Sequence, residues 1–245
     1  MLGKALCACA ILICLVNSSS APGTFETDVV KTPGGDLTIT FIGHGTLMFL
    51  FRGNTILVDP WSRLADYSKL PKADIVLLTH HHPDHLDPAA LKLVSDEKTV
   101  LILTQECRSQ GLEGTVMMSD DTTAVSGIGI EAVPAYTIAG KRPDGRPFHP
   151  RGSGNGYIIT FGGTRVYVAG DTENTPEMKL LRRIDIAFLP MNLPYTMTPE
   201  MVADAALAFR PRILYPYHFG ETDTSRLMEL LKGVPAIEVR IRKMR

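Results

Sequence analysis

Cysteine is scarce in this sequence of 245 residues, and its few cysteines are unevenly placed. Three of the four, Cys7, Cys9 and Cys14, lie close to the N-terminus, and the rest of the chain holds only Cys107. A single cysteine cannot form an internal disulfide, and beyond residue 14 no cluster of thiols is present to hold a metal ion. A metal site in this part of the chain must therefore use nitrogen and oxygen ligands.

The sequence also lacks an excess of either charge. It has 25 basic and 26 acidic residues without long runs, for a net charge of −1, which gives no electrostatic reason to expect a nucleic acid or an anionic membrane as partner. The Gly-x-Ser-x-Gly motif of serine hydrolases is absent as well. Hydrophobic residues, by contrast, make up 44% of the chain, which is ample for a sizeable core.

The first residues differ in kind from the rest. A single lysine, Lys4, precedes an apolar run of 12 residues from Ala5 to Val16, and small polar residues follow. This three-part order is typical of a secretory signal, and the run is too short for a membrane span, which needs about 20 apolar residues. We predict a signal peptide at residues 1–21 and a single domain over residues 22–245.

Removal of such a signal would give an extracytoplasmic protein, either secreted or periplasmic. A buried N-terminal strand or helix is the alternative interpretation of the apolar run. Lipid attachment at Cys14 is disfavoured because the bulky Ile13 precedes it, where a small residue is needed. Peripheral membrane association is therefore expected only if the signal is retained or lipidated.

Short apolar segments separated by turn residues dominate the remaining chain, as expected for many β-strands. Residues 136–154 form a long polar loop rich in glycine and proline, and loops of this length in compact domains usually carry function. The alternation of segments predicts an α/β layered sandwich, two mixed sheets with helices outside. Strands are expected at 37–43, 47–51, 56–60, 73–80, 99–104, 184–191, 212–218 and 236–241, strand-like segments within 115–135, a hairpin over 157–171, and helices at 88–96, 198–211 and 224–233.

Four of the seven histidines lie within six positions of one another, in the stretch "LLTHHHPDHLDP" that follows an apolar strand. At a strand end the chain leaves the sheet, so side chains can converge on a point: His80 and His82 on one ion, Asp84 and His85 on a second. Neutral imidazole and carboxylate suit Zn²⁺, with Fe or Mn as alternatives. The alternative interpretation is a histidine-rich surface tract that binds metal adventitiously.

A true dinuclear site requires further ligands elsewhere in the chain, and suitable residues are present. His218 ends the strand "RILYPYH", Asp171 ends "RVYVAGD", His149 lies in the long loop, and His44 follows the first strand. None of these side chains falls in the middle of a predicted helix. This placement at strand ends favours a built metal site over a surface tract.

From "FIGHGTLMFLF" to "YPYHFG" the sequence resembles the metallo-β-lactamase-fold hydrolases, with the "HHHPDH" cluster followed by "AGDT" and "PYH" in the family's order. The segments "GHGTLMF", "VPAY" and "FHPRGSGNGY" resemble a branch of small metal-dependent hydrolases that includes ascorbate-6-phosphate lactonase-like enzymes, with N-acyl-phosphatidylethanolamine phospholipase D as a more distant relative. The resemblance implies an αββα sandwich with two metal ions at one edge of the paired sheets.

The resemblance also implies a ligand set. His80, His82 and His149 would hold one ion, Asp84, His85 and His218 the other, and Asp171 would bridge them. In many relatives the third histidine of the first group directly follows a motif like "VPA", where this chain has Tyr136 and Thr137. His149 is the only later candidate, and "FHPRGSG" resembles a version of the motif in which this ligand is displaced downstream.

Other residues are given roles with alternatives. His81 is expected to point away from the metals. Asp59 either orients a ligand histidine or forms an Asx-turn before Pro60, and His44 either lines the pocket or caps the first strand. The basic side chains of the loop either contact an anionic substrate or are solvated; these are Lys141, Arg142, Arg146 and Arg151. Three further residues either shape the pocket or are simply packed or solvent-exposed; these are Tyr195, Tyr217 and Glu221.

The expected function is that of a dinuclear metal-dependent hydrolase, and zinc is the metal that the ligand set favours over Mn²⁺ or Fe²⁺. A metal-bridging hydroxide would cleave an ester, lactone or phosphoester bond of a small substrate, and Asp84 would orient this hydroxide or accept its proton. The alternatives are a non-catalytic metal-binding protein and a phosphodiesterase or phospholipase D-like enzyme on the same fold. A di-iron oxidoreductase is disfavoured because no flavin-binding partner domain is present, and a nuclease because the charge is near neutral.

Overall fold

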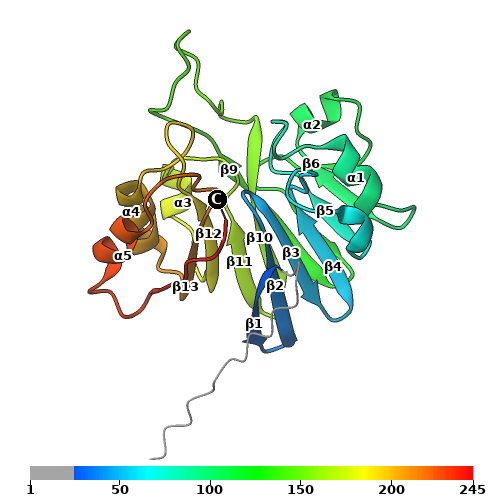
Figure 1. The fold of residues 1–245 in the computed structure, drawn as a ribbon, viewed down its shortest axis with the longest axis horizontal. Coiled ribbons are helices and arrows are strands. Elements are labelled where there is room, and N and C mark those ends of the chain that lie inside the picture. The colour runs from blue at the N-terminus through cyan, green and yellow to red at the C-terminus, as the bar shows by residue number, and fades with distance from the viewer. Residues whose placement is uncertain (1–24, 245) are drawn as a thin grey trace, which may run out of the picture.

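The computed structural model describes residues 25–244, so the signal predicted at residues 1–21 lies outside the described residues. The described chain forms two seven-stranded sheets that face each other. Figure 1 shows the sheets in the middle of the molecule, with one group of helices on each outer side. The predicted layered α/β sandwich is confirmed. The helices are α1 (Pro88–Val94) and α2 (Gln105–Ser109) on one side, and α3 (Pro176–Lys179), α4 (Pro199–Phe209) and α5 (Ser225–Leu231) on the other.

The first sheet comes from the N-terminal half of the chain, and its strands lie in sequence order. The first four strands pair antiparallel and the last three continue in parallel. The strands are β1 (Glu26–Thr32), β2 (Gly35–Gly43), β3 (Thr46–Phe51), β4 (Asn54–Val58), β5 (Ile75–Leu77), β6 (Val100–Leu103) and β7 (Thr115–Val116), with a short 3₁₀ helix, η1 (Tyr67–Lys69), between β4 and β5.

The second sheet repeats this arrangement with the C-terminal half. Four antiparallel strands are again followed by three parallel ones, in sequence order across the sheet. The strands are β8 (Thr122–Val125), β9 (Ile128–Ala135), β10 (Gly154–Phe161), β11 (Thr164–Val168), β12 (Ile186–Pro190), β13 (Ile213–Tyr217) and β14 (Glu238–Val239).

Most predicted elements are found, with shorter bounds. The hairpin turns at Gly162 and Gly163, and α4 begins after the N-cap Thr198 with Pro199 in its first turn. The strand expected over 73–80 is limited to Ile75–Leu77, because the chain then leaves the sheet and Thr79 accepts a backbone hydrogen bond from Asn155 of β10. The edge strand β1 and the short helices α2 and α3 were not anticipated.

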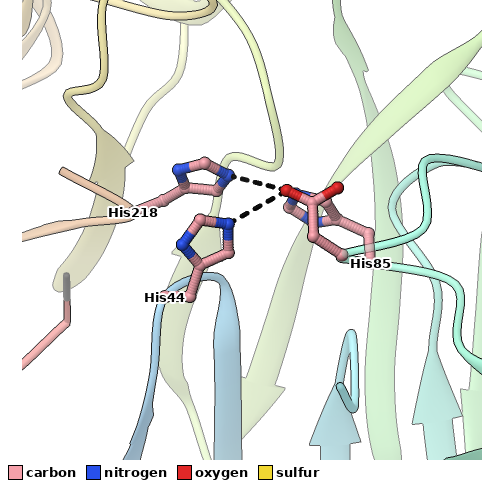
Figure 2. A group of neighbouring side chains, drawn as sticks. His44, His85 and His218 are labelled. Carbon is pink, nitrogen blue, oxygen red and sulfur yellow. Dashed lines mark hydrogen bonds and ion pairs between the residues drawn. The ribbon is translucent and has the colours of Figure 1, made fainter. Parts of the chain in front are cut away.

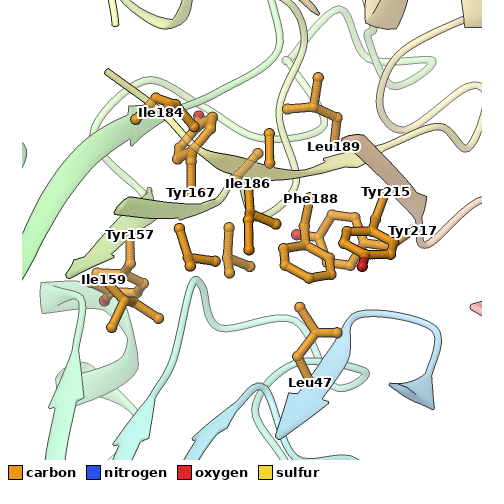
Figure 3. Close-up of a cluster of buried hydrophobic side chains, with 14 of the residues drawn as sticks. Leu47, Tyr157, Ile159, Tyr167, Ile184, Ile186, Phe188, Leu189, Tyr215 and Tyr217 are labelled. Carbon is orange, nitrogen blue, oxygen red and sulfur yellow. The ribbon is translucent and has the colours of Figure 1, made fainter. Parts of the chain in front are cut away.

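The core between the sheets fixes where the strand ends meet. Figure 3 shows Leu47 of β3 opposite a row of side chains from β12 and β13, among them Phe188 and Tyr215. These two rings stack at 4.9 Å between centroids, and Phe41 of β2 packs 5.1 Å from Tyr215. Fully burying one such side chain contributes about 1.5–3 kcal/mol. The packing therefore holds the two sheets, and the loops at their common edge, in one relative position.

Within residues 25–244, no helix is both long enough and apolar enough to cross a membrane.

Candidate metal centre

The histidine cluster is held rigidly where β5 leaves the first sheet. His80 is buried beside β10, and a turn follows in which the carbonyl of His82 accepts from the backbone amides of His85 and Leu86, at 2.9 and 2.8 Å. Asp87 then caps α1 by accepting from Ala89. The cluster is thus tied to a strand at one end and to a helix at the other, so its side chains have little freedom to rearrange.

Three imidazole nitrogens converge in a first group. His82 Nδ1 lies 3.1 Å from His80 Nε2 and 3.2 Å from His149 Nε2. His149 comes from the long loop, where its backbone amide donates to Thr137 Oγ1 and its carbonyl accepts from the Thr137 amide. The structure therefore brings His149 to the cluster, in the position that the resemblance implied for the displaced ligand.

A second group gathers around the carboxylate of Asp84. Its Oδ2 lies 3.7 Å from His85 Nε2 and 3.7 Å from His218 Nε2. Figure 2 shows His218 and His44 directed at this same carboxylate from the opposite side of the site to His85. The rings of His85 and His218 are nearly parallel, 5.2 Å apart. These residues come from the cluster and from the end of β13, which are 133 positions apart in sequence.

Asp171 lies between the two groups. Its Oδ2 is 3.3 Å from His149 Nε2 and 4.0 Å from His80 Nε2, whereas its Oδ1 is 3.5 Å from His218 and 3.6 Å from His85. The residue before it must be glycine: Gly170 has φ +65°, and a Cβ there would lie 2.9 Å from the carbonyl oxygen of Asn155. The carboxylate thus has one oxygen toward each group.

Several polar atoms at this point lack protein partners. His85 Nε2, His218 Nε2 and Asp171 Oδ1 are buried without a hydrogen bond among the described residues. Buried polar atoms are nearly always paired, so orphaned atoms need an explanation. Imidazole nitrogens and carboxylate oxygens that face one another at 3.5–3.6 Å have the chemistry and spacing to share a metal ion. The residues present fit such an ion.

Asp59 supports the site from behind. Its carboxylate accepts from the backbone amide and hydroxyl of Thr79, at 2.8 and 2.6 Å, and lies 2.8 Å from His85 Nδ1. These partners are 20 and 26 residues away, so the carboxylate does not form the alternative local turn. A carboxylate on the second nitrogen of a ligand histidine fixes its tautomer and orientation. This leaves His85 Nε2 directed at the site.

His44 lies at the site rather than only ending β2. Its Nε2 is 3.0 Å from Asp84 Oδ2, and its ring lies 3.7 Å from that of His218. Three site residues at strand ends, His44, Asp59 and His218, have φ between 46° and 50°. This left-handed conformation is uncommon outside glycine and asparagine. Such strain is most often found at functional sites, where the surrounding structure maintains it.

The local electrostatics keep His80, His82 and Asp171 in the deprotonated form that binds metal, whereas His85 is held protonated. Burial lowers the pKa of His80 well below its usual range, and burial together with the neighbouring His149 lowers that of His82 to about 4. For Asp171, burial acts in the opposite direction, but His218 and His85 outweigh it and hold the pKa well below normal. Burial also opposes protonation of His85, yet Asp171 and Asp59 raise its pKa to about 9.

A cavity of about 470 Å³ opens above these residues, a volume typical of sites for small molecules. Of the residues considered from sequence, Arg142 and Tyr195 line it. Tyr217 does not: it is fully buried, and its hydroxyl accepts from the Gly170 amide. Glu221 is exposed and outside the lining. The lining consists of His44, His82, Pro83, Asp84, Arg142, Phe148, His149, Asp171, Asn192, Tyr195 and His218.

Glu173 anchors the long loop, and sequence analysis missed it. Its buried carboxylate accepts from three successive backbone amides, those of Ile138, Ala139 and Gly140, at 2.7–2.9 Å. Because Glu173 follows Asp171 by two residues, it links the turn of the bridging carboxylate to the loop that carries His149. The only signal in the sequence is an acidic residue beside a strand end, which does not reveal partners more than 30 positions away.

Comparison with known proteins agrees with this geometry. The profile of the Beta-lactamase superfamily domain matches residues 38–218, more than half of the chain. The chain therefore belongs to this superfamily and has the metallo-β-lactamase fold, and it is a metal-dependent hydrolase.

Individual relatives carry the same description. The chain is 29% identical over 221 residues to a UPF0173 metal-dependent hydrolase of Pelotomaculum thermopropionicum, covering 84% of this chain and 96% of that one. It is 31% identical over 219 residues to a UPF0173 metal-dependent hydrolase of Koribacter versatilis, covering 83% and 94%. A crystal structure of a proposed metal-dependent hydrolase from Parabacteroides distasonis matches with 50% identity and a TM-score of 0.86, over 90% of this chain and all of that one.

Proposed function

We propose that this protein is a dinuclear metal-dependent hydrolase. One ion would be held by His80, His82 and His149, the second by Asp84, His85 and His218, with Asp171 shared between them. Zinc is the metal that this donor set favours, and Mn²⁺ or Fe²⁺ are alternatives.

The observation that carries this proposal is the pair of side-chain groups on either side of Asp171. Three nitrogens meet in one group, and three nitrogens, counting that of His44, meet with the carboxylate oxygen of Asp84 in the other. Each oxygen of Asp171 faces a different group. An ion in the first group alone would leave His85 Nε2, His218 Nε2 and Asp171 Oδ1 buried without a partner, at a cost of about 1–3 kcal/mol for each unsatisfied polar atom.

Two such ions would supply a hydroxide nucleophile at neutral pH and would stabilise the charge that develops on the oxygen under attack. The chain's own residues orient the reacting groups. His218 and His44 lower the pKa of Asp84 against the opposing effect of burial, so this carboxylate is an ionised acceptor at the floor of the cavity. Asp84 is thereby placed to orient the nucleophile or to receive its proton, and His44 holds Asp84 in position.

The bond cleaved is proposed to be an ester, lactone or phosphoester bond of a small substrate. The cavity volume of about 470 Å³ supports a small molecule rather than a polymer. A phosphodiesterase or phospholipase D-like activity, in which the nucleophile attacks phosphorus instead of a carbonyl carbon, is an alternative on the same fold. A non-catalytic metal-binding role is the remaining alternative.

Elemental analysis and substrate assays test the proposal together. The purified protein should hold close to two metal equivalents and should hydrolyse at least one member of a panel of ester, lactone, phosphodiester and β-lactam substrates. Removal of metal by a chelator should abolish this activity, and added Zn²⁺ should restore it. Failure to retain or take up any metal on titration would contradict the proposal, and metal binding without turnover would favour the non-catalytic alternative.

The extracytoplasmic location also remains a proposal, supported by the apolar run after Lys4. N-terminal sequencing of protein isolated from its native host should find a chain beginning near residue 22. An intact Met1 in a cytoplasmic fraction would contradict it.

A further inference from the structure

The two ring nitrogens of His82 face different surroundings. Nδ1 lies within 3.2 Å of the nitrogens of His80 and His149, in the first ligand group. Nε2 is directed away from that group, and it lies 3.3 Å from Nη2 of Arg142. Both residues line the cavity above the site.

The two other ligand histidines of the cluster have protein partners at their outer nitrogens, whereas Nδ1 of His149 and of His218 is buried without one among the described residues. His85 Nδ1 meets the carboxylate of Asp59 at 2.8 Å, and His80 Nδ1 meets the hydroxyl of Thr79 at 3.0 Å. Metal-bound histidines nearly always donate this second N–H to an acceptor such as a carboxylate, carbonyl or water. At His82 the neighbour is a guanidinium, which has five donors and no acceptor.

When His82 Nδ1 is used for metal binding, its lone pair is occupied, and Nε2 of the neutral ring carries the hydrogen. Two N–H groups, one on His82 and one on Arg142, then stand 3.3 Å apart with no acceptor between them. This arrangement is unfavourable in the protein alone. It becomes favourable when an oxygen atom with negative charge accepts from both groups, because charge-assisted hydrogen bonds are about twice as strong as neutral ones.

Arg142 is positioned and lacks a competing acid. Its Nη2 also donates to the carbonyl of Phe148 at 3.3 Å, and its guanidinium lies 5.8 Å from the Phe148 ring. Within residues 25–244, no carboxylate forms an ion pair with it, whereas Arg146 and Arg151 of the same loop pair with Asp144 and Glu177. Of the four basic residues in the loop, only Arg142 lines the cavity.

We propose that Arg142 and the outer N–H of His82 form an anion subsite, which binds a carboxylate or phosphate group of the substrate remote from the bond that is cleaved. The substrate is therefore a small anionic molecule. This inference rests on the proposed function, because it requires a metal ion at His82 Nδ1.

The rest of the cavity suits a small body carrying such a group. The rings of Phe148 and Tyr195 pack edge to face, 5.0 Å apart, and form an aromatic wall next to Arg142. The side-chain amide of Asn192 also lines the cavity and has no hydrogen-bond partner within the part of the chain that the structure describes. A substrate would thus find one cationic contact, an apolar wall and one neutral polar group.

Matched esters test the subsite in the metal-loaded enzyme. Mono-4-nitrophenyl succinate carries a remote carboxylate, and 4-nitrophenyl butyrate is a neutral ester of similar length with the same leaving group. Arg142→Ala should lower kcat/KM for the succinate ester about ten- to a hundredfold, the loss expected for a charge-assisted hydrogen bond. Most of this change should appear in KM, because a remote contact binds the substrate and the transition state equally.

Two other variants provide controls. Arg142→Lys, which keeps the charge but not the fork of donors, should fall between the wild type and the alanine variant. Arg146→Ala, which removes the same charge from the same loop, should leave both esters unaffected. An equal loss of activity on both esters in Arg142→Ala, with unchanged metal content, would overturn the proposal.

A binding experiment tests the anion subsite independently of the proposed hydrolysis. Calorimetric titration of the metal-loaded protein with succinate and with inorganic phosphate requires no turnover. Weaker binding of either anion in Arg142→Ala, but not in Arg146→Ala, supports the subsite even if neither ester is hydrolysed, and the anion affected identifies its charge type. Equal binding of both anions by all three proteins would overturn it whatever the esterase result.

Discussion

The two halves of the molecule have the same topology but contribute differently to the site. Each half is a sheet of four antiparallel strands followed by three parallel ones. The first half supplies His80, His82, Asp84 and His85 from one short turn after β5. The second supplies His149 from the long loop, and Asp171 and His218 from beyond the ends of β11 and β13. The equivalent turn of the second half, after β12, carries no candidate ligand and instead presents Asn192 and Tyr195 to the cavity.

The carboxylates at equivalent strand ends show this difference most clearly. Asp59 directly follows β4, and Asp171 lies two residues further beyond the end of its counterpart, β11. Asp59 is occupied by Thr79 and His85, whereas Asp171 Oδ1 has no protein partner among the described residues. The same topological position thus yields a support for a ligand in one half and a candidate ligand in the other.

The largest effect is expected from the carboxylate of the second half. Asp171→Asn removes the negative charge that faces both ligand groups, so we expect loss of metal and a decrease in kcat of about a thousandfold or more, which corresponds to roughly 4 kcal/mol of transition-state stabilisation. Elemental analysis and steady-state kinetics measure the two effects. Retention of two metal equivalents with near-normal turnover would show that Asp171 is not shared.

Metal affinity should also depend on pH through His85. In the metal-free protein its pKa of about 9 keeps this imidazole protonated at neutral pH, so metal binding must displace the proton. The apparent affinity should therefore rise about tenfold per pH unit between pH 7 and 9 and then level off. Calorimetry in buffers of different ionisation enthalpy measures the proton released, and a pH-independent affinity in this range would contradict the assignment.

The raised pKa of His85 also affects the stability of the metal-free protein, and this stability changes with pH in the opposite direction to the metal affinity. Because the pKa of His85 is raised by folding, its protonated form stabilises the metal-free fold below pH 6.5, and this contribution is lost as pH rises through about 9. Alkaline conditions should thus favour metal binding while weakening the metal-free protein. Thermal unfolding of the metal-free protein between pH 6 and 10 measures this decrease.

The carboxylate of the first half should have a smaller effect than that of the second. Asp59→Asn keeps the shape but weakens the orientation of His85, for which a loss of about 10–100-fold in metal affinity or activity is typical. It should also lower the pKa of His85 and so reduce the proton release described above. If Asp59→Asn and Asp171→Asn have equal effects on metal content, the distinction between support and ligand is wrong.

Replacement of Glu173 tests how the long loop of the second half, residues 136–154, is anchored. Glu173→Gln leaves one acceptor in place of two for the amides of Ile138, Ala139 and Gly140, and we expect a destabilisation of about 1–3 kcal/mol. Because the same loop carries His149, metal affinity should fall by less than tenfold, and the pKa of His85 should be unaffected. Glu200→Gln, at the exposed pair with Arg226 outside this loop, is the matched control. Equal unfolding midpoints for the two variants would contradict an anchoring role.

The sequence was informative where local rules apply. The strands, the capped helix α4 and the strand-end positions of His80, His218 and Asp171 follow from hydrophobic patterning and turn residues. The roles of Asp59 and Asp171 were implied by the resemblance and not by patterning, because the decisive partners, Thr79 for one and His149 for the other, lie at least 20 positions away. The loop over 136–154 gave no periodicity, so neither the Glu173 anchor nor the selection of Arg142 among four basic residues could be deduced.

The smallest effect is expected from the one histidine of the cluster that joins neither ligand group. His81 lies between His80 and His82, contacts the His82 ring at 5.0 Å, and does not line the cavity. Adjacent residues in the turn cannot all converge on the metals, so His81→Ala should retain both metals. Its activity should fall by less than about tenfold, which is the loss typical of the weakest supporting contacts. His82→Ala, one position away, should lose metal from the first group and most activity. Equal losses of metal and activity in the two variants would show that the turn presents His81 to the metals. The expected contrast would instead support metal ligands at alternate positions, His80 and His82, with His81 between them directed away.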